Sequence, residues 1–575
     1  MSSASATRSL GRPAILVLGA ATLVAAFLVL VPLLVLLFSA FRGPPDFLPF
    51  ESQAQWSLEN LGTLYRNTAL LGRMLPDTLT SVAGTVLFTS VTAFTLAWLV
   101  ERTDLPGASS AFVLILFPLL IPVNILAVAW IYLMGPNAGW LNVALRTVLG
   151  LEGGGPINIF SMGGLILCQS LVLTPYVFLL LLATLRSMNP AMEEASAASG
   201  ASQLTTFRRV TLPMLLPGIL APVILATIIV LEQFELPLMI GLPARLNIFA
   251  YRIYYELNPA DGLPNYGAAA AISFLFLLTA IALLVVYNRA VRNADKFTTI
   301  TGKGYRQKRL QLGRWKLPAI VFLCTYLALA AVLPAAVLIW TSFFGFTVPS
   351  LEALPKFSMA AYSSLFSDNR FWLGLRNTLL VATLSALVVT VLGAVLGLII
   401  TRTRLRWRGA VDVMSFVSIG IPSVIVGLAV MIIFLTVPIG IYGTVWILLI
   451  AYSYRLATTT RTARAALMQI HTELEEASTV SGASWLTTQR RIMLPLLAPA
   501  MASAFMLLFI IGAREFTIPL VLASEDNIVI SVLIWRLYQA GQAAETAALA
   551  TLVILAVLPV LLLARFLPIA RSNMD

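Results

Sequence analysis

The chain has 575 residues, of which 59% are hydrophobic and only 11% are charged, and its mean hydropathy is +0.92. A soluble domain carries about 25% charged residues, so this composition excludes an ordinary soluble protein and predicts an integral membrane protein. The net charge of +12 does not indicate nucleic-acid binding, because Lys and Arg gather in short segments beside apolar runs, as expected for loops retained in the cytoplasm.

Apolar segments long enough to cross a hydrocarbon core of about 30 Å recur along the whole chain, and twelve membrane spans are expected. The first, residues 14–40, follows Arg8 and Arg12. It is too long for the apolar part of a cleaved signal peptide, so we expect it to be retained. The N-terminus is then cytoplasmic, and an even number of spans puts the C-terminus on the same side.

The loops between these spans alternate in charge. By the positive-inside rule we assign residues 101–107 and 185–212 to the cytoplasm, and residues 42–76, 135–163 and 236–266 to the opposite side. The most basic segment, residues 289–316, is expected to be a cytoplasmic linker. It separates a first half, residues 1–288, from a second half, residues 317–575.

The second half repeats the first. Ile421 and Pro422 correspond to Ile121 and Pro122 at an offset of 300 residues, and after a shorter outer loop at 438–443 the offset becomes 282. Because each half has an even number of spans, both share one orientation, which disfavours an inverted-repeat secondary transporter. The expected fold is an all-α polytopic membrane protein built from two tandem, parallel six-helix repeats.

The strongest repeat lies in a polar loop. MEEASAASGASQLTTFRRVTLP at 192–213 corresponds to LEEASTVSGASWLTTQRRIMLP at 474–495, and 17 of 28 positions are identical between 192–219 and 474–501. Glu193 and Glu194 follow Asn189 and Pro190 and suit the first turn of a short helix, and Gly200 permits a tight turn after it. A lone copy would also suit an amphipathic hairpin on lipid headgroups, but two copies indicate that both face the same kind of partner.

The first loop resembles the E-A-A, G, I-x-L-P loop of ATP-binding-cassette (ABC) importer permeases. The matching residues are Glu194-Ala195-Ser196, Gly200 and Val210-x-Leu212-Pro213, with Ser in place of the second Ala and Val in place of Ile. The second copy fits at the same spacing with Ile492. The resemblance covers the whole chain as two fused permease halves with the type I importer fold. It implies that loops at about 186–213 and 461–495 couple to two ATPase subunits during alternating access. The expected coupling residues are Glu193, Glu194, Ala195, Gly200, Leu212, Pro213, Glu475, Glu476, Ala477, Gly482, Leu494 and Pro495.

The chain itself is not expected to be an enzyme. A phosphate-binding G-x-x-x-x-G-K-[ST] motif is absent from the sequence, and TGKGYRQK at 301–308 lacks the upstream Gly, since position 297 is Phe. His471 is the sole histidine, and Cys168 and Cys324 both lie in apolar spans, so no catalytic triad, disulfide framework or metal site is expected. ATP and Mg²⁺ would be bound by the partner ATPase subunits.

Charged residues after each repeated loop are candidates for the pathway. LEQFELPLMIG at 231–241 aligns with AREFTIPLVLA at 513–523. Ionisable groups near spans tend to face a cavity or a partner, so these residues either line the pathway or contact a substrate-binding protein at the outer rim. They are Glu232, Gln233, Glu235, Arg514 and Glu515.

The cargo is indicated by resemblance only. Three segments are most similar to ferric-iron importer permeases of the bacterial inner membrane. They are TPYVFLLLLATLRSMNPAMEEAS at 174–196, FTTITGKGYRQKRLQLGRW at 297–315 and REFTIP at 514–519. Such a system implies a periplasmic or extracellular substrate-binding protein. Thiamine, polyamine and aminoethylphosphonate importers remain alternatives, and an ATP-independent secondary transporter, a channel or a membrane enzyme are more distant ones.

Overall fold

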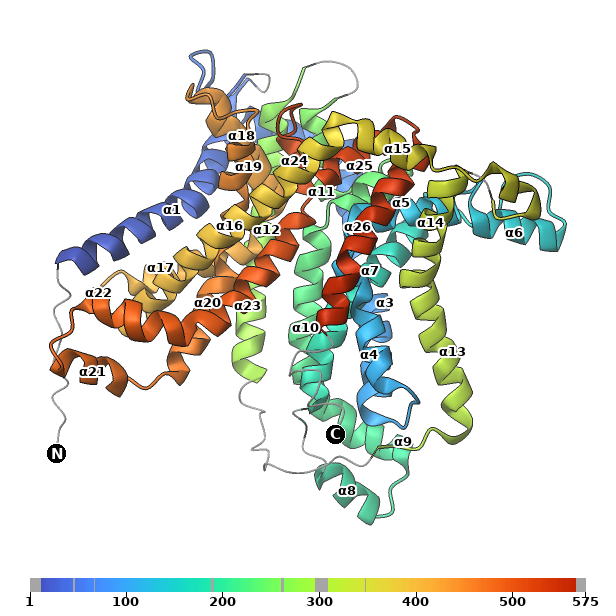
Figure 1. The fold of residues 1–575 in the computed structure, drawn as a ribbon, viewed down its shortest axis with the longest axis horizontal. Helices are drawn as coiled ribbons and strands as arrows, with labels where there is room; N and C mark the ends of the chain where they lie inside the picture. The colour runs from blue at the N-terminus through green and yellow to red at the C-terminus, as the bar shows by residue number, and fades with distance from the viewer. Residues whose placement is uncertain are drawn as a thin grey trace. The chain divides into compact units, whose positions relative to one another are not determined.

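The computed structural model describes residues 12–564, apart from 45–46, 67, 187, 189–190, 260–262, 295–308 and 347. The described chain is almost entirely helical, which confirms the all-α prediction (Figure 1). One small antiparallel pair, β1 (Arg42–Gly43) with β2 (Gln55–Trp56), follows the first helix. Both chain ends, Asn189 and Pro190, and much of the predicted basic linker lie outside the described residues.

Among the described residues, eight helices are long and apolar enough to cross a membrane. Two further helix pairs pass the same test when each pair is taken as one span, which makes up to ten. The eight are Ala14–Ala40, Leu71–Arg102, Met162–Arg186, Gln203–Glu232, Tyr266–Tyr287, Gly313–Phe344, Asn369–Arg402 and Trp485–Ala513.

The two bent pairs break at the repeated Ile-Pro dipeptide. The helix axis turns by 99° between Ala108–Leu120 and Val123–Met134, and by 108° between Arg408–Gly420 and Ser423–Thr436. Ile121 and Ile421 are extended at these breaks, because a following proline disfavours helical backbone angles in the residue before it. The same sequence signal therefore produces the same sharp bend in both halves.

Twelve spans were expected, and the difference lies in two places of the second half. Residues 445–469 form two short helices, Val445–Tyr452 and Leu456–Gln469, rather than one span. The second of them, LATTTRTARAALMQ, is too polar for the bilayer core. The last helix, Ala543–Ala564, has an apolar stretch of Ala543–Ala556 in the part of the chain that the structure describes.

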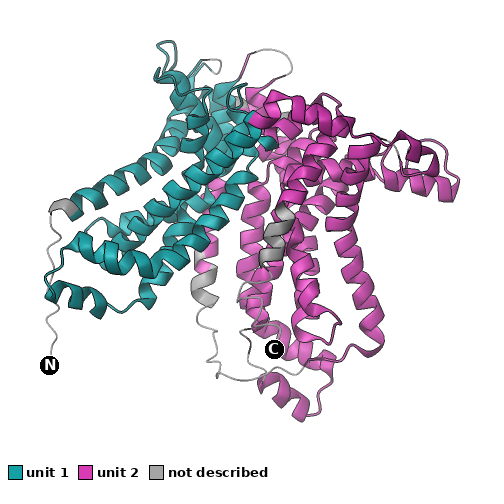
Figure 2. Cartoon of the chain, in the orientation of Figure 1, with its two compact units in different colours: residues 1–61, 265–277, 373–530 teal, residues 62–264, 278–372, 531–575 magenta. Residues whose placement is uncertain are grey.

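The chain divides into two compact units, drawn in different colours in Figure 2. Unit 1 contains residues 1–61, 265–277 and 373–530, and helices α2, α12, α16 and α25 pass from one unit to the other. Its elements are α1 (Arg12–Ala40), β1, β2, the start of α12 (Tyr266–Ala294), most of α16 (Asn369–Arg402), α17 (Arg408–Val417), η8 (Ser418–Gly420), α18 (Ser423–Thr436), α19 (Val445–Tyr452), α20 (Leu456–Gln469), α21 (Glu473–Val480), α22 (Trp485–Thr488), η9 (Gln489–Met493), α23 (Leu494–Ala513) and α24 (Thr517–Val521).

Unit 2 contains residues 62–264, 278–372 and 531–575. Its elements are most of α2 (Glu59–Arg66), α3 (Thr68–Arg102), α4 (Ala108–Leu116), η1 (Phe117–Leu120), α5 (Val123–Met134), α6 (Trp140–Leu149), α7 (Met162–Arg186), α8 (Ala191–Ala198), α9 (Gln203–Thr206), η2 (Phe207–Thr211), α10 (Leu212–Glu232), η3 (Pro237–Gly241), α11 (Phe249–Leu257), the end of α12, η5 (Gly313–Trp315), α13 (Lys316–Leu327), η6 (Ala328–Val332), α14 (Leu333–Phe344), η7 (Leu351–Lys356), α15 (Ala360–Ser367), α25 (Ile530–Gln539) and α26 (Ala543–Ala564).

These units do not follow the two halves of the sequence. In unit 1, α1 from the first half packs against α17 and α18 from the second. In unit 2, α13 and α14 from the second half pack against α4 and α5 from the first, and Trp130 Nε1 donates a hydrogen bond to the Leu329 carbonyl at 2.9 Å. Unit 1 therefore combines the core of the second half with α1 and the start of α12 from the first half. Unit 2 combines the core of the first half with the first and last helices of the second half.

The described end of the linker is fixed to the first half. Leu310 donates its backbone N–H to the Arg102 carbonyl at 2.8 Å, and Asp104 donates its backbone N–H to the Leu310 carbonyl at 3.1 Å. The Asp104 carboxylate accepts from the backbone N–H of Leu312 at 2.9 Å. The linker is thus attached to the loop that follows α3.

Candidate functional site

The two repeated loops fold in the same way, one at the end of each unit. In unit 2, the short helices α8 and α9 are followed by the π-helical turn η2, and in unit 1, α21 and α22 are followed by the π-helical turn η9 (Figure 1). Pro213 and Pro495 stand one residue inside the next helix. A proline ring clashes with the carbonyl four residues earlier, here Arg209 or Arg491 of the turn, and the wider π turn accommodates it.

The turn between the short helices requires glycine in both copies. Gly200 has φ +81° and Gly482 has φ +78°. The next residue closes the turn, because the Ala201 N–H bonds the Ser196 carbonyl at 3.2 Å and the Ala483 N–H bonds the Ser478 carbonyl at 3.1 Å. This is the six-residue closure typical of a helix that ends at a left-handed glycine.

A hydroxyl pair joins the two short helices of each loop. Ser196 Oγ lies 2.8 Å from Thr206 Oγ1, and Ser478 Oγ lies 2.9 Å from Thr488 Oγ1. These serines occupy the position of the second Ala in the family motif, where an alanine has no group for this bond. The departure from the motif therefore gives both loops an additional internal contact.

The first glutamate of each loop is tied to the end of a long helix. Glu193 forms an ion pair with Arg102 at the end of α3 and accepts a hydrogen bond from Thr211 Oγ1 at 2.6 Å. Glu475 Oε1 lies 3.2 Å from Arg402 Nε at the end of α16, an ion pair by distance without the alignment of a hydrogen bond. The side chains of Arg102 and Arg402 are 6% and 12% exposed, so these ion pairs are largely removed from water. We call the two pairs the loop tethers.

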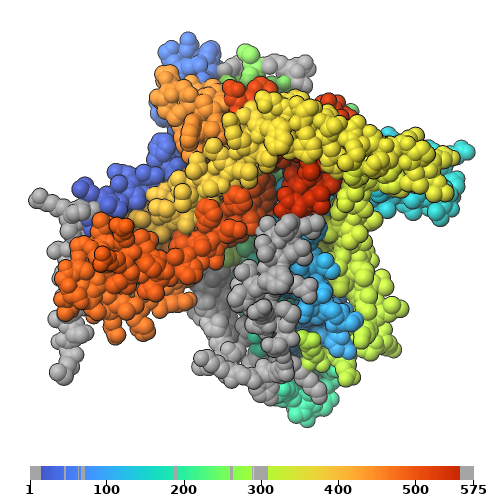
Figure 3. Space-filling view, in the orientation of Figure 1, coloured from blue at the N-terminus to red at the C-terminus, as the bar shows by residue number. Residues whose placement is uncertain are grey.

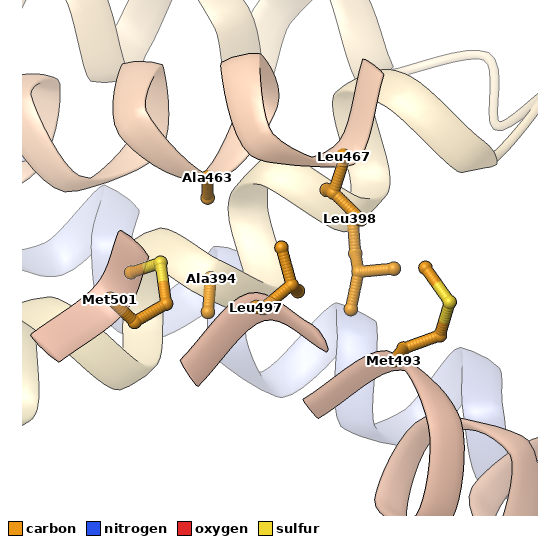
Figure 4. Close-up of a cluster of buried hydrophobic side chains, with 7 residues drawn as sticks. All are labelled: Ala394, Leu398, Ala463, Leu467, Met493, Leu497 and Met501. Carbon is orange, nitrogen blue, oxygen red and sulfur yellow. The ribbon is translucent and has the colours of Figure 1, made fainter. Parts of the chain in front are cut away.

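The packing beneath the loops differs between the units. In unit 1, aliphatic and methionine side chains from α16, α20, η9 and α23 form a buried cluster below the loop (Figure 4): Ala394, Leu398, Ala463, Leu467, Met493, Leu497 and Met501. In unit 2, the Phe207 ring lies 5.2 Å from Trp98 and 6.4 Å from Phe94 instead. The loop conformation is thus kept although aromatic rings, Phe94 and Trp98, stand at the positions of Ala394 and Leu398.

The outward faces of the loops are partly acidic and partly apolar. Glu194 and Glu476 are exposed. Leu204 is 59% exposed and its counterpart Leu486 is 63% exposed. An exposed leucine and an exposed carboxylate therefore occur at the same positions of both loops.

Of the remaining candidates, Glu515 lies in a buried polar cluster of unit 1. It forms an ion pair with Arg455, whose Nη2 also donates to Ser423 Oγ at 2.9 Å. The Arg455 guanidinium lies 5.2 Å from the Tyr454 ring centroid. Three helix breaks meet here, at 421–422, 453–455 and 514–516, and together they bring Arg455 and Glu515 into contact.

The corresponding positions of the first half cannot form such an ion pair. At the repeat offset of 282, Arg455 corresponds to Leu173 and Glu515 to Gln233. Glu232 and Gln233 stand where α10 ends, and Glu235 follows two residues later, after the helix break; all three are half-buried. Arg514 is half-buried at the corresponding end of α23.

Comparison with known families decides the class of the chain. The family described as "Binding-protein-dependent transport system inner membrane component" matches residues 93–298 and 390–568, together more than half of the chain and once in each half. The chain belongs to this family. The permease has an all-α polytopic fold of the type I importer class and resembles fused permeases of ferric-iron importers.

Three curated relatives carry ferric-transport names. A putative ferric transport system permease protein FbpB 1 of Haemophilus influenzae is 25% identical over 66% of this chain and 58% of its own length. Ferric transport system permease protein FbpB of Actinobacillus pleuropneumoniae is 24% identical over 74% and 61%. An Fe(3+)-transport system permease protein FbpB 2 of H. influenzae is 25% identical over 76% and 79%. The permease therefore spans about three fifths of the length of the first two.

Sequence reasoning about the permease missed Arg455 and the loop tethers. Arg455 follows the apolar run of α19 and precedes a run of hydroxyl residues. The signal that could have identified it as a candidate was its charge within an expected span. Arg102 and Arg402 end long helices at the repeat offset of 300 and could have been paired with the loop glutamates on that ground. The remaining expected coupling residues are exposed, except for half-buried Leu212.

Proposed function

We propose that this permease is the transmembrane subunit of an ATP-driven, binding-protein-dependent importer, and that each repeated loop receives one ATPase subunit. The observation that supports this most directly is the duplication of a complete local structure: the glycine turn, the loop tether and the exposed acidic and apolar face. A headgroup contact requires no such match between two loops, whereas two copies of one ATPase subunit require two equal binding surfaces.

In this proposal the two glutamates of each loop have different roles. Glu193 and Glu475 hold the loop to α3 and α16, while Glu194 and Glu476 contact the ATPase subunit. ATP and Mg²⁺ are bound and ATP is hydrolysed on the ATPase subunits. This division of roles follows from burial, because a carboxylate engaged in a largely buried ion pair is costly to withdraw.

The loop tethers provide a mechanical link. When the ATPase dimer closes, its movement is transmitted through each loop to the long helix that the tether holds, and the permease shifts between inward-open and outward-open states. The loops then lie in the cytoplasm, consistent with Arg208, Arg209, Arg490 and Arg491 beside them.

We further propose that the cargo is ferric iron, selected by a substrate-binding protein outside the membrane. The support is the ferric-transport names of three relatives at 24–25% identity. Ferric iron is a hard cation that prefers oxygen ligands, but the carboxylate of Glu515 is already engaged by Arg455. The permease would therefore pass the cargo on rather than hold it at a dedicated site.

The test is the ATPase activity of the permease co-purified with its ATPase in lipid nanodiscs. The binding protein is added empty or loaded in turn with ferric iron, thiamine, putrescine or aminoethylphosphonate. We expect stimulation by the ferric form, and we expect Glu194→Lys with Glu476→Lys to remove it. Glu473→Lys, an exposed glutamate outside the motif, is the matched control and should behave as wild type.

The outcomes separate the two parts of the proposal. Stimulation by another loaded form would overturn the iron assignment and leave ATPase coupling intact. If no ATPase co-purifies and none is stimulated, the importer reading is wrong, and a secondary transporter or channel becomes the better explanation.

A further inference from the structure

One outer loop of the first half is longer than its counterpart by 18 residues, the difference between the offsets of 300 and 282. Residues 135–161 correspond to only 435–443 in the second half. The additional residues fold into α6 (Trp140–Leu149) with two flanking segments. We call residues 135–161 the outer arm.

The outer arm is held in one conformation by two polar side chains. Asn142 is fully buried, donates to the carbonyls of Gly135 at 2.8 Å and Ile157 at 2.7 Å, and accepts from the Ile157 N–H at 2.9 Å. Arg146 donates to the carbonyls of Asn137 and Gly153, both at 2.7 Å. These contacts hold the segments on both sides of α6 against it.

Asn142 and Arg146 of α6 face inward to the arm, whereas the end of the helix, from Thr147 to Leu149, is exposed. Leu141, Leu145, Val148 and Leu149 share one side of the helix at spacings of three and four residues. Val148 is 81% exposed and Leu149 is 59% exposed. The arm has no net charge, because Arg146 and Glu152 are its only charged residues.

The arm projects sideways past a membrane span. Figure 1 shows α6 extending beyond α13 and α14 at the end of unit 2 opposite α8, and Figure 3 shows its atoms outside the edge of α13. That span faces lipid, since Leu317 is 70% exposed and Val321 is 55% exposed. A bilayer crossed by this span would therefore have its surface under the projecting helix.

Aromatic rings mark the level at which the arm joins the span. Trp140 of α6 lies 6.2 Å from Trp340 of α14, and Trp340 stacks on Phe344 at 4.0 Å. Phe357, 5.7 Å from Phe344, is 57% exposed. Tryptophan is enriched where a membrane protein meets the lipid headgroups, and here two tryptophans stand at the end of the span.

We propose that α6 lies in the lipid–water interface of the leaflet opposite the repeated loops, with Val148 and Leu149 inserted among the acyl chains. Lipid is favoured over a protein partner because the helix extends away from its unit over the bilayer, because its outward side is apolar, and because the arm carries no net charge to attract a protein. An amphipathic helix of this kind buries its apolar face about 5–10 Å into the headgroup and acyl boundary. It would hold α13 and α14 at a fixed depth.

The test uses single cysteines on two sides of α6. Cys324 is exposed and is first replaced by Ser, while Cys168 is buried and stays. Val148→Cys is labelled with an environment-sensitive fluorophore in nanodiscs, and quenching by lipids brominated near the headgroup end of the acyl chains is measured. Thr147→Cys, exposed and about 100° further round the helix, is the control, and Leu149→Cys is a second labelled position.

We expect blue-shifted emission and at least about twofold stronger quenching at position 148 than at 147, because an interfacial helix immerses one side only. Leu149→Cys should behave like Val148→Cys. Equal, water-like emission at positions 147, 148 and 149 would overturn the proposal. So would a blue shift at position 148 that occurs only after the loaded binding protein is added, since the apolar side would then be a protein-docking surface.

Discussion

Replacing Gly200 and Gly482 together by valine is the sharpest test of the loop geometry. Both glycines have φ near +80°, and a Cβ added at either would meet nothing within 4 Å. The cost is therefore conformational rather than steric, about 1–2 kcal/mol for a left-handed L-residue and at the upper end for a β-branched one. Each loop then loses a factor of about 5–30 in the population of its native turn.

The assay is cargo uptake by cells, together with the amount of ATPase that co-purifies with the membrane-inserted permease. We expect the double valine variant to remain inserted, because nothing packs on either glycine, but to lose transport and most of its bound ATPase. Asparagine tolerates left-handed angles, so the double asparagine variant should retain much of both. Gly409→Val, at an exposed glycine with open space and an ordinary φ, is the matched control.

Normal uptake by the double valine variant would refute the reasoning. Equal loss by valine and asparagine would also contradict it, because the backbone conformation would then not be the cause. In that case the glycines would be needed for their lack of a side chain, as in a close approach of the partner subunit.

Three further expectations concern the neighbouring polar contacts. Glu475→Gln should loosen the loop, so we expect slower ATPase-dependent uptake and faster proteolysis of the loop when the ATPase is absent. Glu476→Gln should weaken ATPase binding and leave proteolysis unchanged. The reverse pattern would exchange the roles of the two glutamates. Arg455→Met should destabilise the permease by about 3–5 kcal/mol, as expected when one partner of a buried ion pair is left alone. Adding Glu515→Leu should recover most of that loss in thermal unfolding, and no recovery would mean that the two charges act separately. Ser478→Ala should cost about 0.5–1.5 kcal/mol of local stability, and a loop equally protected from hydrogen exchange would argue against the hydroxyl bond.

Much of the helical plan could be predicted because it depends on local signals. Long apolar runs predict spans, and Ile-Pro at 121–122 and 421–422 marks breaks that the structure turns by 99° and 108°. The glycine turn of each loop was also predictable, since the small residues before Gly200 and the polar ones after it leave few other conformations. These features require no information from distant parts of the chain.

Contacts between distant residues could not be predicted in the same way. The ion pair of Arg102 with Glu193 joins residues 91 apart, and that of Arg455 with Glu515 joins residues 60 apart. Taken alone, Arg102, Glu193 and Glu515 resemble ordinary loop or span-end charges, and Arg455, although it falls within an expected span, does not reveal its partner. The pairing depends on where three helices break, which single-sequence patterns do not determine.

Among the described residues, the count of candidate spans is lower than the expected twelve where a helix is short or interrupted. Hydropathy treats residues 445–469 as one segment, but the chain breaks near Arg455 so that its guanidinium can reach Glu515 and Ser423. The sequence also does not predict which residues form each compact unit. Repeats indicate duplication, but they do not reveal which first helix packs on which core. The proposed halves, residues 1–288 and 317–575, stay a prediction about the duplication.

The packing of α1 on α17 and α18 has a consequence for synthesis in the cell. Ala40 and Arg408 are separated by nearly 370 residues, which a ribosome takes about 20–70 seconds to add at about 5–20 residues per second. During that interval α1 has entered the bilayer before its partner helices exist. An 18-residue stretch of α1 has a mean hydropathy of 2.9, and no residue between Ala14 and Ala40 is charged. These properties suit a helix that must stay in lipid without its final partners, so synthesis as well as the finished fold constrains this segment.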